Sequence, residues 1–295
     1  MTRRWQKTGE PFAHVLSVLA LGFGSLAGCN DSGTRLPEAA TFESVCVSAG
    51  ICDEAPAPPE IVDVVCDGSV GTSCTRENLR ATIEAVARFL GPRSGSRLRL
   101  WAMGSSVAET RVVGEVATPT LTERTRTRRT QLDRFVARTV TTLALAIEPS
   151  LARGGVHRSP IAESLTKIAF ADGYGLPRRI IVVSHAREFS SLRDFACGKL
   201  PSETEFARAL RKRGLLSAGS FAHIRTVFAF VTSAPVGALR CPVHMDRELR
   251  IRELWRTAIT RAGASEVRFD SGVPVIVGER PSPSPNPSND RRHAP

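Results

Sequence analysis

Lysine is scarce in this chain of 295 residues, so arginine supplies nearly all of the positive charge behind a formal net charge of +11. The lysines are Lys7, Lys167, Lys199 and Lys212. This skew toward arginine is more typical of codon usage in a GC-rich genome than of a surface built to bind a polyanion. Aromatic side chains of the kind that stack on bases are not interleaved with the arginines. The composition therefore argues against a nucleic-acid-binding protein.

The densest basic segment, Arg124–Arg129, holds four arginines in six residues. It lies where a helix is expected to begin, and such runs usually form a solvated helix face. A basic surface also attracts anionic lipid headgroups or cell-wall polymers. An arginine-rich binder of anionic polymers therefore stays open as an alternative function.

Long apolar runs are missing after residue 29, so no later segment is expected to span a membrane. Before that point, a cationic start at residues 3–7 is followed by an apolar stretch from about Phe12 to Leu26. This stretch is too short to cross a bilayer and is typical of a secretion signal. We expect residues 1–28 to be such a signal.

The apolar stretch ends in Leu26-Ala27-Gly28-Cys29, which resembles the lipobox of bacterial lipoproteins. The resemblance implies cleavage before Cys29 and transfer of a diacylglyceryl group to its thiol. Several acyl chains on one cysteine give durable anchoring, because each buried methylene contributes about 0.8 kcal/mol. An ordinary secretory signal with a nearby cleavage site is the alternative, and it exports the protein as well.

Removing the signal takes away three positive charges and one negative charge, which lowers the formal net charge from +11 to +9. By resemblance to enterobacterial sorting, Asn30 directly after the cysteine favours the periplasmic face of the outer membrane over the inner membrane. Residues 29–60 are expected to form a tether, and the Pro/Ser-rich residues 279–295 a disordered tail. The expected partners are the membrane, through the lipid, and another envelope protein.

Six cysteines remain after the lipidated one, and an even number in an exported chain indicates disulfides. They are Cys46, Cys52, Cys66, Cys74, Cys197 and Cys241. We expect Cys197 to pair with Cys241, because both follow strands that should be neighbours, and the other four to staple the tether to the first strand and its loop. Cys66 and Cys74 also flank that loop, so a bond between them would hold its shape without an ion. No pair has the close spacing of a zinc site.

Short β-branched runs alternate along the chain with segments whose apolar residues recur at helical spacing. The later runs are apolar at successive positions, as strands buried on both faces of a parallel sheet should be. Thr75 is expected to cap the first helix, and Gly91 to end it in a left-handed conformation. The expected strands are 61–66, 97–103, 111–116, 179–184, 224–231 and 266–269, and the expected helices are 75–90, 121–147, 161–170, 202–216 and 245–262. This order predicts one α/β domain over residues 61–278, a doubly wound, mostly parallel sheet with helices on both faces.

Three loops within this order resemble those of the von Willebrand factor A domain, and the resemblance covers roughly residues 61–275. In that family a divalent ion binds above the strand carboxyl ends, held by an Asp-x-Ser-x-Ser loop, a hydroxyl before a middle helix and an Asp after the fourth strand. Asp67 and Ser69 match the first loop, whose last serine is replaced by Gly71. Ser159 keeps the hydroxyl, whereas His185 stands where the family has Asp. The resemblance therefore implies a degenerate metal site made of Asp67, Ser69, Ser159 and His185.

Replacing a carboxylate by an imidazole removes a negative charge and a hard ligand, so it weakens Mg²⁺ binding and favours softer ions. We expect either no cofactor or a weakly held divalent cation, Mg, Mn or Zn. The same residues also have ordinary structural interpretations. Asp67 would cap the helix turn, Ser159 would be an N-cap, and His185 would bond a strand-end carbonyl.

The expected function is a lipid-anchored cell-envelope module that binds or scaffolds another protein through its strand-end loops, without catalytic residues. A hydrolase is the alternative from a different class, and its candidate residues are Ser69, Ser184, His157, His185, Asp172 and Asp194. No Gly-x-Ser-x-Gly elbow supports it, and the segment 66–69 resembles a Gly-Asp-Ser hydrolase block only loosely.

Overall fold

The computed structural model describes residues 57–69, 72–121, 125–152, 158–195, 197–231 and 245–276. The chain divides into two units, residues 1–53 and 54–295, and all of these described residues belong to the second. The predicted signal, the predicted lipidation site Cys29 and the predicted tail therefore lie outside them. Within the described ranges, every helix is too short or too polar to cross a bilayer.

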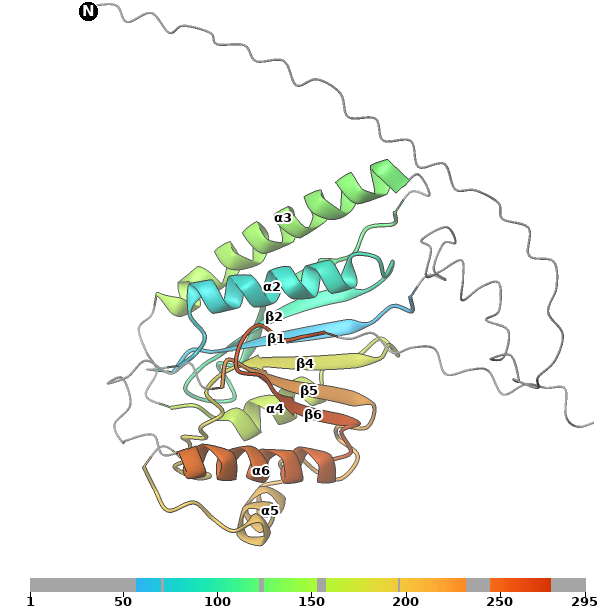
Figure 1. Cartoon of the computed structure of the whole chain (residues 1–295). Helices are drawn as coiled ribbons and strands as arrows, with labels where there is room; N and C mark the ends of the chain where they lie inside the picture. Colours follow the sequence, from blue (N-terminus) through green and yellow to red (C-terminus); the bar gives the residue numbers. More distant parts are fainter. Residues whose placement is uncertain are drawn as a thin grey trace, which may run out of the picture. The chain divides into compact units, whose positions relative to one another are not determined.

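Six strands form one sheet in the order β3-β2-β1-β4-β5-β6 (Figure 1). All neighbouring strands are parallel except β2 and β3, which are antiparallel. The strands are β1 (Ile61–Asp67), β2 (Arg97–Met103), β3 (Arg111–Ala117), β4 (Arg178–Val183), β5 (Ile224–Ala229) and β6 (Glu266–Phe269). This is a doubly wound order, and it confirms the predicted α/β fold.

Helices cover both faces of the sheet (Figure 1). On one face lie α2 (Arg76–Leu90) and α3 (Thr125–Leu151), and on the other lie α4 (Ile161–Ala169), α5 (Glu203–Lys212) and α6 (Met245–Arg261). Each layer encloses its own hydrophobic core. Strand β1 contributes to both, since Val62 and Val64 pack beneath α2 while Val65 packs on the α4 side. Each fully buried valine contributes roughly 1.5–3 kcal/mol to folding.

The ends of several helices differ from the predicted ones. The hydroxyl of Thr75 accepts a hydrogen bond from the amide of Asn78, so the predicted N-cap is confirmed. Gly91 is not left-handed: its φ of −47° and ψ of −44° continue the helix. A Cβ atom on Gly91 would lie 2.8 Å from Leu132 Cδ2 of α3. Close helix packing, not a left-handed turn, therefore requires glycine there.

Helices α3 and α5 also end elsewhere than predicted. Helix α3 runs from Thr125 to Leu151 and includes Pro149, whereas the apolar spacing predicted residues 121–147. Helix α5 stops at Lys212 rather than at residue 216, because Gly214 follows with a φ of +66°. Neither shift moves a strand end, so the position of the strand-end loops is unaffected.

A charged cluster is buried near the amino ends of the strands, around Asp63 of β1. Its Oδ1 accepts hydrogen bonds from Arg99 Nε (2.7 Å) and Trp101 Nε1 (2.8 Å), and its Oδ2 from Arg99 Nη2 (3.0 Å) and Arg178 Nη2 (2.7 Å). Arg178 also donates to the carbonyl oxygens of Ile168 and Ala169 at the end of α4. A cation at a helix C-terminus is favourable, so the cluster fixes α4 against three strands.

Candidate functional site

The site predicted from the sequence lies where the chain reverses its winding direction. Strand β1 leads through α2 toward β2 on one side, while its neighbour β4 leads through α5 toward β5 on the other. Ligands of doubly wound proteins bind in the crevice outside the strand carboxyl ends at such a switch point. Asp67 is the last residue of β1, and Ser184 and His185 directly follow β4.

Asp67 is almost fully buried and accepts three hydrogen bonds. Its Oδ2 accepts from the hydroxyls of Ser159 (2.8 Å) and Ser184 (2.6 Å), and its Oδ1 from the backbone amide of Ser69 (3.1 Å). One interpretation of the sequence made Ser159 the N-cap of α4. That interpretation is wrong, because the Ser159 hydroxyl donates to Asp67 and the N-cap is Pro160. Hydrogen bonds to a carboxylate are stronger than those between neutral groups. Asp67 thus joins the end of β1, the segment before α4 and the end of β4, a set that we call the Asp67 cross-link.

The loop after β1 is fixed by two further bonds. A disulfide joins Cys66 and Cys74, whose Cα atoms lie 5.5 Å apart, and the hydroxyl of Ser73 donates to the carbonyl oxygen of Phe230, 2.6 Å away. This bond confirms the interpretation that Cys66 and Cys74 hold the shape of the loop. The preferred prediction, that these two cysteines staple the tether to the strand, is wrong.

The remaining predicted disulfides fall largely outside the described residues. Cys197 is disulfide-bonded as well, and its pairing with Cys241, which lies outside the described residues, stays a prediction. The strands that precede these two cysteines, β4 and β5, are neighbours as expected. Cys46 and Cys52 also lie in the part of the chain that the structure leaves undescribed.

His185 is buried beside this cross-link, in surroundings that favour the neutral form of its imidazole. Burial lowers the pKa of its imidazole, and the nearby Arg187 lowers it further, against the opposing charges of Asp67 and Glu248. Its Nδ1 accepts a hydrogen bond from the backbone amide of Arg187 at 3.1 Å. In a neutral imidazole the other nitrogen then carries the proton. The hydrogen-bond partner of His185 Nδ1 is therefore a backbone amide, whereas the sequence suggested a strand-end carbonyl as the partner of this side chain.

Helix α6 holds the segment after β4 in place. Arg187 Nε donates to Glu248 Oε1 at 2.9 Å, and its Nη2 contacts the same oxygen; both side chains are buried. Trp255 Nε1 donates to the carbonyl oxygen of Ala186 at 2.7 Å. Ala186 has a φ of +60°, a left-handed conformation that costs a non-glycine residue energy. The contacts with α6 maintain this conformation and keep His185 beside Asp67.

Glu188, the next charged residue, caps α4 from outside the helix. The N-cap of α4 is Pro160, which makes no side-chain cap, and Glu188 Oε2 instead accepts from the amide of Ala162 at 3.0 Å. Burial is the main cause that raises the pKa of Glu188 to about 8; the charge of Glu163 also raises it, while bonds to Ser190 and the helix amides lower it. Glu188 is therefore protonated at neutral pH.

The four residues of the predicted metal site do not fit a tightly held divalent ion. They supply a single carboxylate, and both of its oxygens already accept hydrogen bonds from protein donors. Neither nitrogen of His185 offers a free lone pair, since one accepts the Arg187 amide and the other carries the proton. Ser69 Oγ is buried and makes no hydrogen bond within the described ranges, but one neutral hydroxyl does not replace the missing charge. No cluster of three His, Cys, Asp or Glu side chains occurs among the described residues.

The hydrolase candidates are not brought together as a nucleophile and base. The hydroxyl of Ser184 donates to Asp67 rather than to His185. Asp172 precedes β4 and accepts from the amide of Tyr174, so it lies at the opposite edge of the sheet. Asp194 accepts from the amide of Cys197, and His157 lies outside the described residues. These contacts support no acyl-transfer site.

Three residues that act at this site were not identified from the sequence, namely Arg187, Glu188 and Glu248. The sequence carried a signal for Arg187 and Glu188, because these two charged residues lie only a few positions after the apolar end of β4. A charge in that position must either reach solvent or find a partner. Glu248 gives no such signal, since an acidic residue in the first turn of a helix is ordinary.

Comparisons with family models and with curated proteins give no match. Among solved structures, an aerotolerance-related membrane protein from Bacteroides fragilis matches with a TM-score of 0.33 and 10% identity, over 72% of this chain and 90% of that one. The pilus adhesin SpaC from Lactobacillus rhamnosus GG matches with a TM-score of 0.37 and 10% identity, over 74% and 29%. A von Willebrand factor type A protein from Catenulispora acidiphila matches with a TM-score of 0.29 and 11% identity, over 70% and 43%. The chain thus spans most of the first protein and less than half of the other two. The assignment of the fold is based on the strand order described above.

Proposed function

We propose that the chain is a lipid-anchored envelope protein that captures a protein partner at the carboxyl edge of its sheet, as a von Willebrand factor A-like module without a tightly bound metal ion. The observation that carries the proposal is the Asp67 cross-link, a rigid support beneath the strand-end loops. Because the loop bases are already ordered, a partner that binds them costs the protein little conformational entropy.

Exposed apolar side chains lie on the connections at this edge. Val107 follows β2, Met245 and Leu249 begin α6, and Val273 and Val275 follow β6. Met245 and Val275 are the most exposed of them, at 68% and 66%. Covering such side chains with a partner removes apolar surface from water, which favours association.

The lipid anchor follows from the lipobox-like segment that ends at Cys29. An anchor restricts the domain to one membrane surface and so raises its local concentration near other envelope proteins. The acyl chains hold the protein at the membrane, whereas the strand-end surface determines which partner binds.

Site-specific photo-crosslinking in the bacterium that makes the protein tests the location of the binding surface. A photoreactive phenylalanine analogue replaces Met245 at the carboxyl edge or Phe170 at the amino edge; both native side chains are 68% exposed. We expect a covalent adduct with an envelope protein from position 245 and none from position 170. An adduct from position 170 alone, or none from positions 245, 107 and 275, would refute the proposal.

A further inference from the structure

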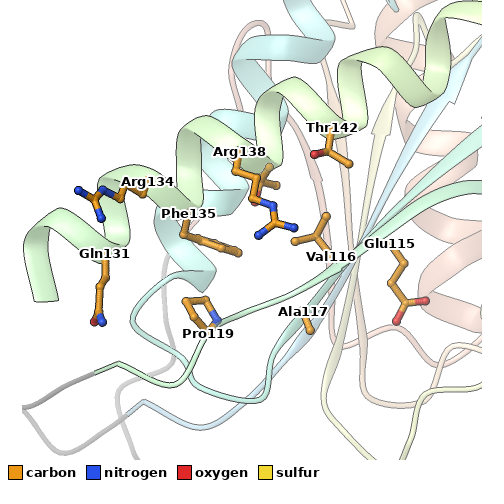
Figure 2. A pocket seen from close by; sticks show the side chains of 10 residues that line it. Glu115, Val116, Ala117, Pro119, Gln131, Arg134, Phe135, Arg138 and Thr142 are labelled. Atoms are coloured by element: carbon orange, nitrogen blue, oxygen red, sulfur yellow. The ribbon is translucent and has the colours of Figure 1, made fainter.

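A second surface feature lies away from the Asp67 cross-link, between the N-terminal half of α3 and the end of β3. It is a groove of about 540 Å³ (Figure 2). Strand β3 is antiparallel to β2 and ends at Ala117, so the groove lies toward the amino edge of the parallel strands. At Gly114 the helix touches the strand, since a Cβ atom there would lie 2.6 Å from Leu143 Cδ2. Toward its N-terminus α3 rises away from the sheet (Figure 1).

One wall of the groove is the edge strand of the described sheet. Strand β3 is first in the strand order and, among the described strands, pairs with β2 alone. Residues 115–117 of this strand, together with Pro119, line the groove. The outer side of an edge strand presents unpaired backbone N–H and C=O groups that can pair with an extended peptide. The lining from 115 to 119 is long enough for about five residues of extended chain.

The other wall is cationic above an apolar base. Arg134 and Arg138 come from exposed positions on α3, and neither makes an ion pair or hydrogen bond within the described ranges. Figure 2 shows Phe135 and Arg138 reaching from the helix toward the strand. The acidic residue of the lining, Glu115, already pairs with Arg97 at 2.6 Å. The groove therefore has unneutralised positive charge.

Two further features of α3 are unfavourable in the free protein. Thr139 lines the groove, and its Oγ1 is buried without a hydrogen-bond partner among the described residues, which costs desolvation energy. The first turn of α3 has no acidic residue and instead carries arginines, although the positive end of a helix dipole disfavours cations. An anionic partner at this end of α3 would offset the electrostatic cost.

We propose that the groove between α3 and β3 binds an extended acidic segment of a protein partner, which adds as a strand to β3 and places its carboxylates against Arg134 and Arg138. Backbone pairing selects an extended peptide, and the two arginines select acidic side chains on it. The apolar base formed with Phe135 accepts the side chains that alternate with the acidic ones. This surface is separate from the strand-end surface of the proposed function and does not depend on it.

Fluorescence anisotropy with the full chain in detergent micelles tests this proposal. The probe is a fluorescein-labelled peptide of alternating Glu and Val, compared with a Lys/Val peptide and with the Glu/Val peptide carrying N-methylated backbone amides. The double variant Arg134→Glu/Arg138→Glu reverses the charge of the groove. Arg80→Glu/Arg208→Glu changes the net charge equally at exposed positions of α2 and α5, outside the groove. Urea unfolding midpoints confirm that both variants fold.

We expect saturable binding of the Glu/Val peptide, weakened at least about tenfold in the groove variant and changed much less in the control. N-methylation should abolish binding, and the Lys/Val peptide should not bind. Absence of binding, or equal weakening in the two double variants, would overturn the proposal. Polyphosphate that displaces the probe, together with undiminished binding of the N-methylated peptide, would overturn it too, because the arginines would then bind anionic polymers without strand pairing.

Discussion

The carboxylate of Asp67 at the end of β1 accepts a hydrogen bond of 2.6 Å from the hydroxyl of Ser184 at the end of β4. The two strands are neighbours at the point where the sheet reverses its winding direction. The hydroxyl of Ser159 donates to the same oxygen, so Asp67 Oδ2 accepts hydrogen bonds from two protein hydroxyls. The position at which the sequence resemblance implied an ion thus holds a structural cross-link here.

Asp67→Asn should lower the free energy of unfolding by about 2–3 kcal/mol, because the amide keeps the size of the side chain but loses the charge that strengthens three hydrogen bonds. Urea denaturation of the full chain in detergent measures the change. Asp133→Asn is the matched control, an exposed residue of α3, and should have almost no effect. Equal stability of the two variants would show that the cross-link contributes nothing.

Asp63→Ala should destabilise the fold more, by about 3–5 kcal/mol, because it leaves the buried guanidinium groups of Arg99 and Arg178 without their carboxylate. Glu84→Ala breaks the exposed pair with Arg88 and should cost less than about 1 kcal/mol. Thermal or urea unfolding separates the two. A loss below that of Glu84→Ala would mean that the buried cluster is not formed.

Glu188 should make the protein less stable as the pH rises. Its pKa is raised to about 8 in the folded protein from 4.5 in the unfolded chain, so the unfolded state loses this proton first. The contribution of protonated Glu188 to the free energy of unfolding is fully present below pH about 4.5. It declines as the pH rises and is lost above pH about 8. Glu188→Gln should therefore gain stability relative to the native protein across this interval. A constant difference between the two proteins at all pH values would contradict this.

Much of the fold could be predicted from the sequence because its signals are local. Runs rich in β-branched and other apolar residues identify β1, β4 and β5, and helical spacing identifies the helices between them. The cross-links could not be predicted, since Asp67 and Ser184 are 117 residues apart and Asp63 and Arg178 are 115 apart. The strand register and the packing of α4 bring these pairs together. Asp63 gave only a weak signal, a charge within a β-branched run.

Cys29→Ser should release the protein from the membrane, because the lipid, and not an apolar helix, is expected to hold it there. Metabolic labelling with an alkyne analogue of palmitate should mark the native protein and leave the variant unmarked. Cell fractionation then follows the move of the variant to the soluble fraction. Ser32→Ala serves as a control in the same segment. A Cys29→Ser protein that stays with the membrane would contradict lipid anchoring.

The proposed function requires the carboxyl edge of the sheet to bind a protein partner without a tightly held ion. Photo-crosslinking from position 245 in isolated envelopes, with and without EDTA, tests it most directly. We expect an adduct of unchanged yield after chelation and none from position 170. An adduct that disappears with EDTA and returns with Mg²⁺ would contradict the ion-free site, and an adduct from position 170 in place of 245 would contradict the binding surface itself.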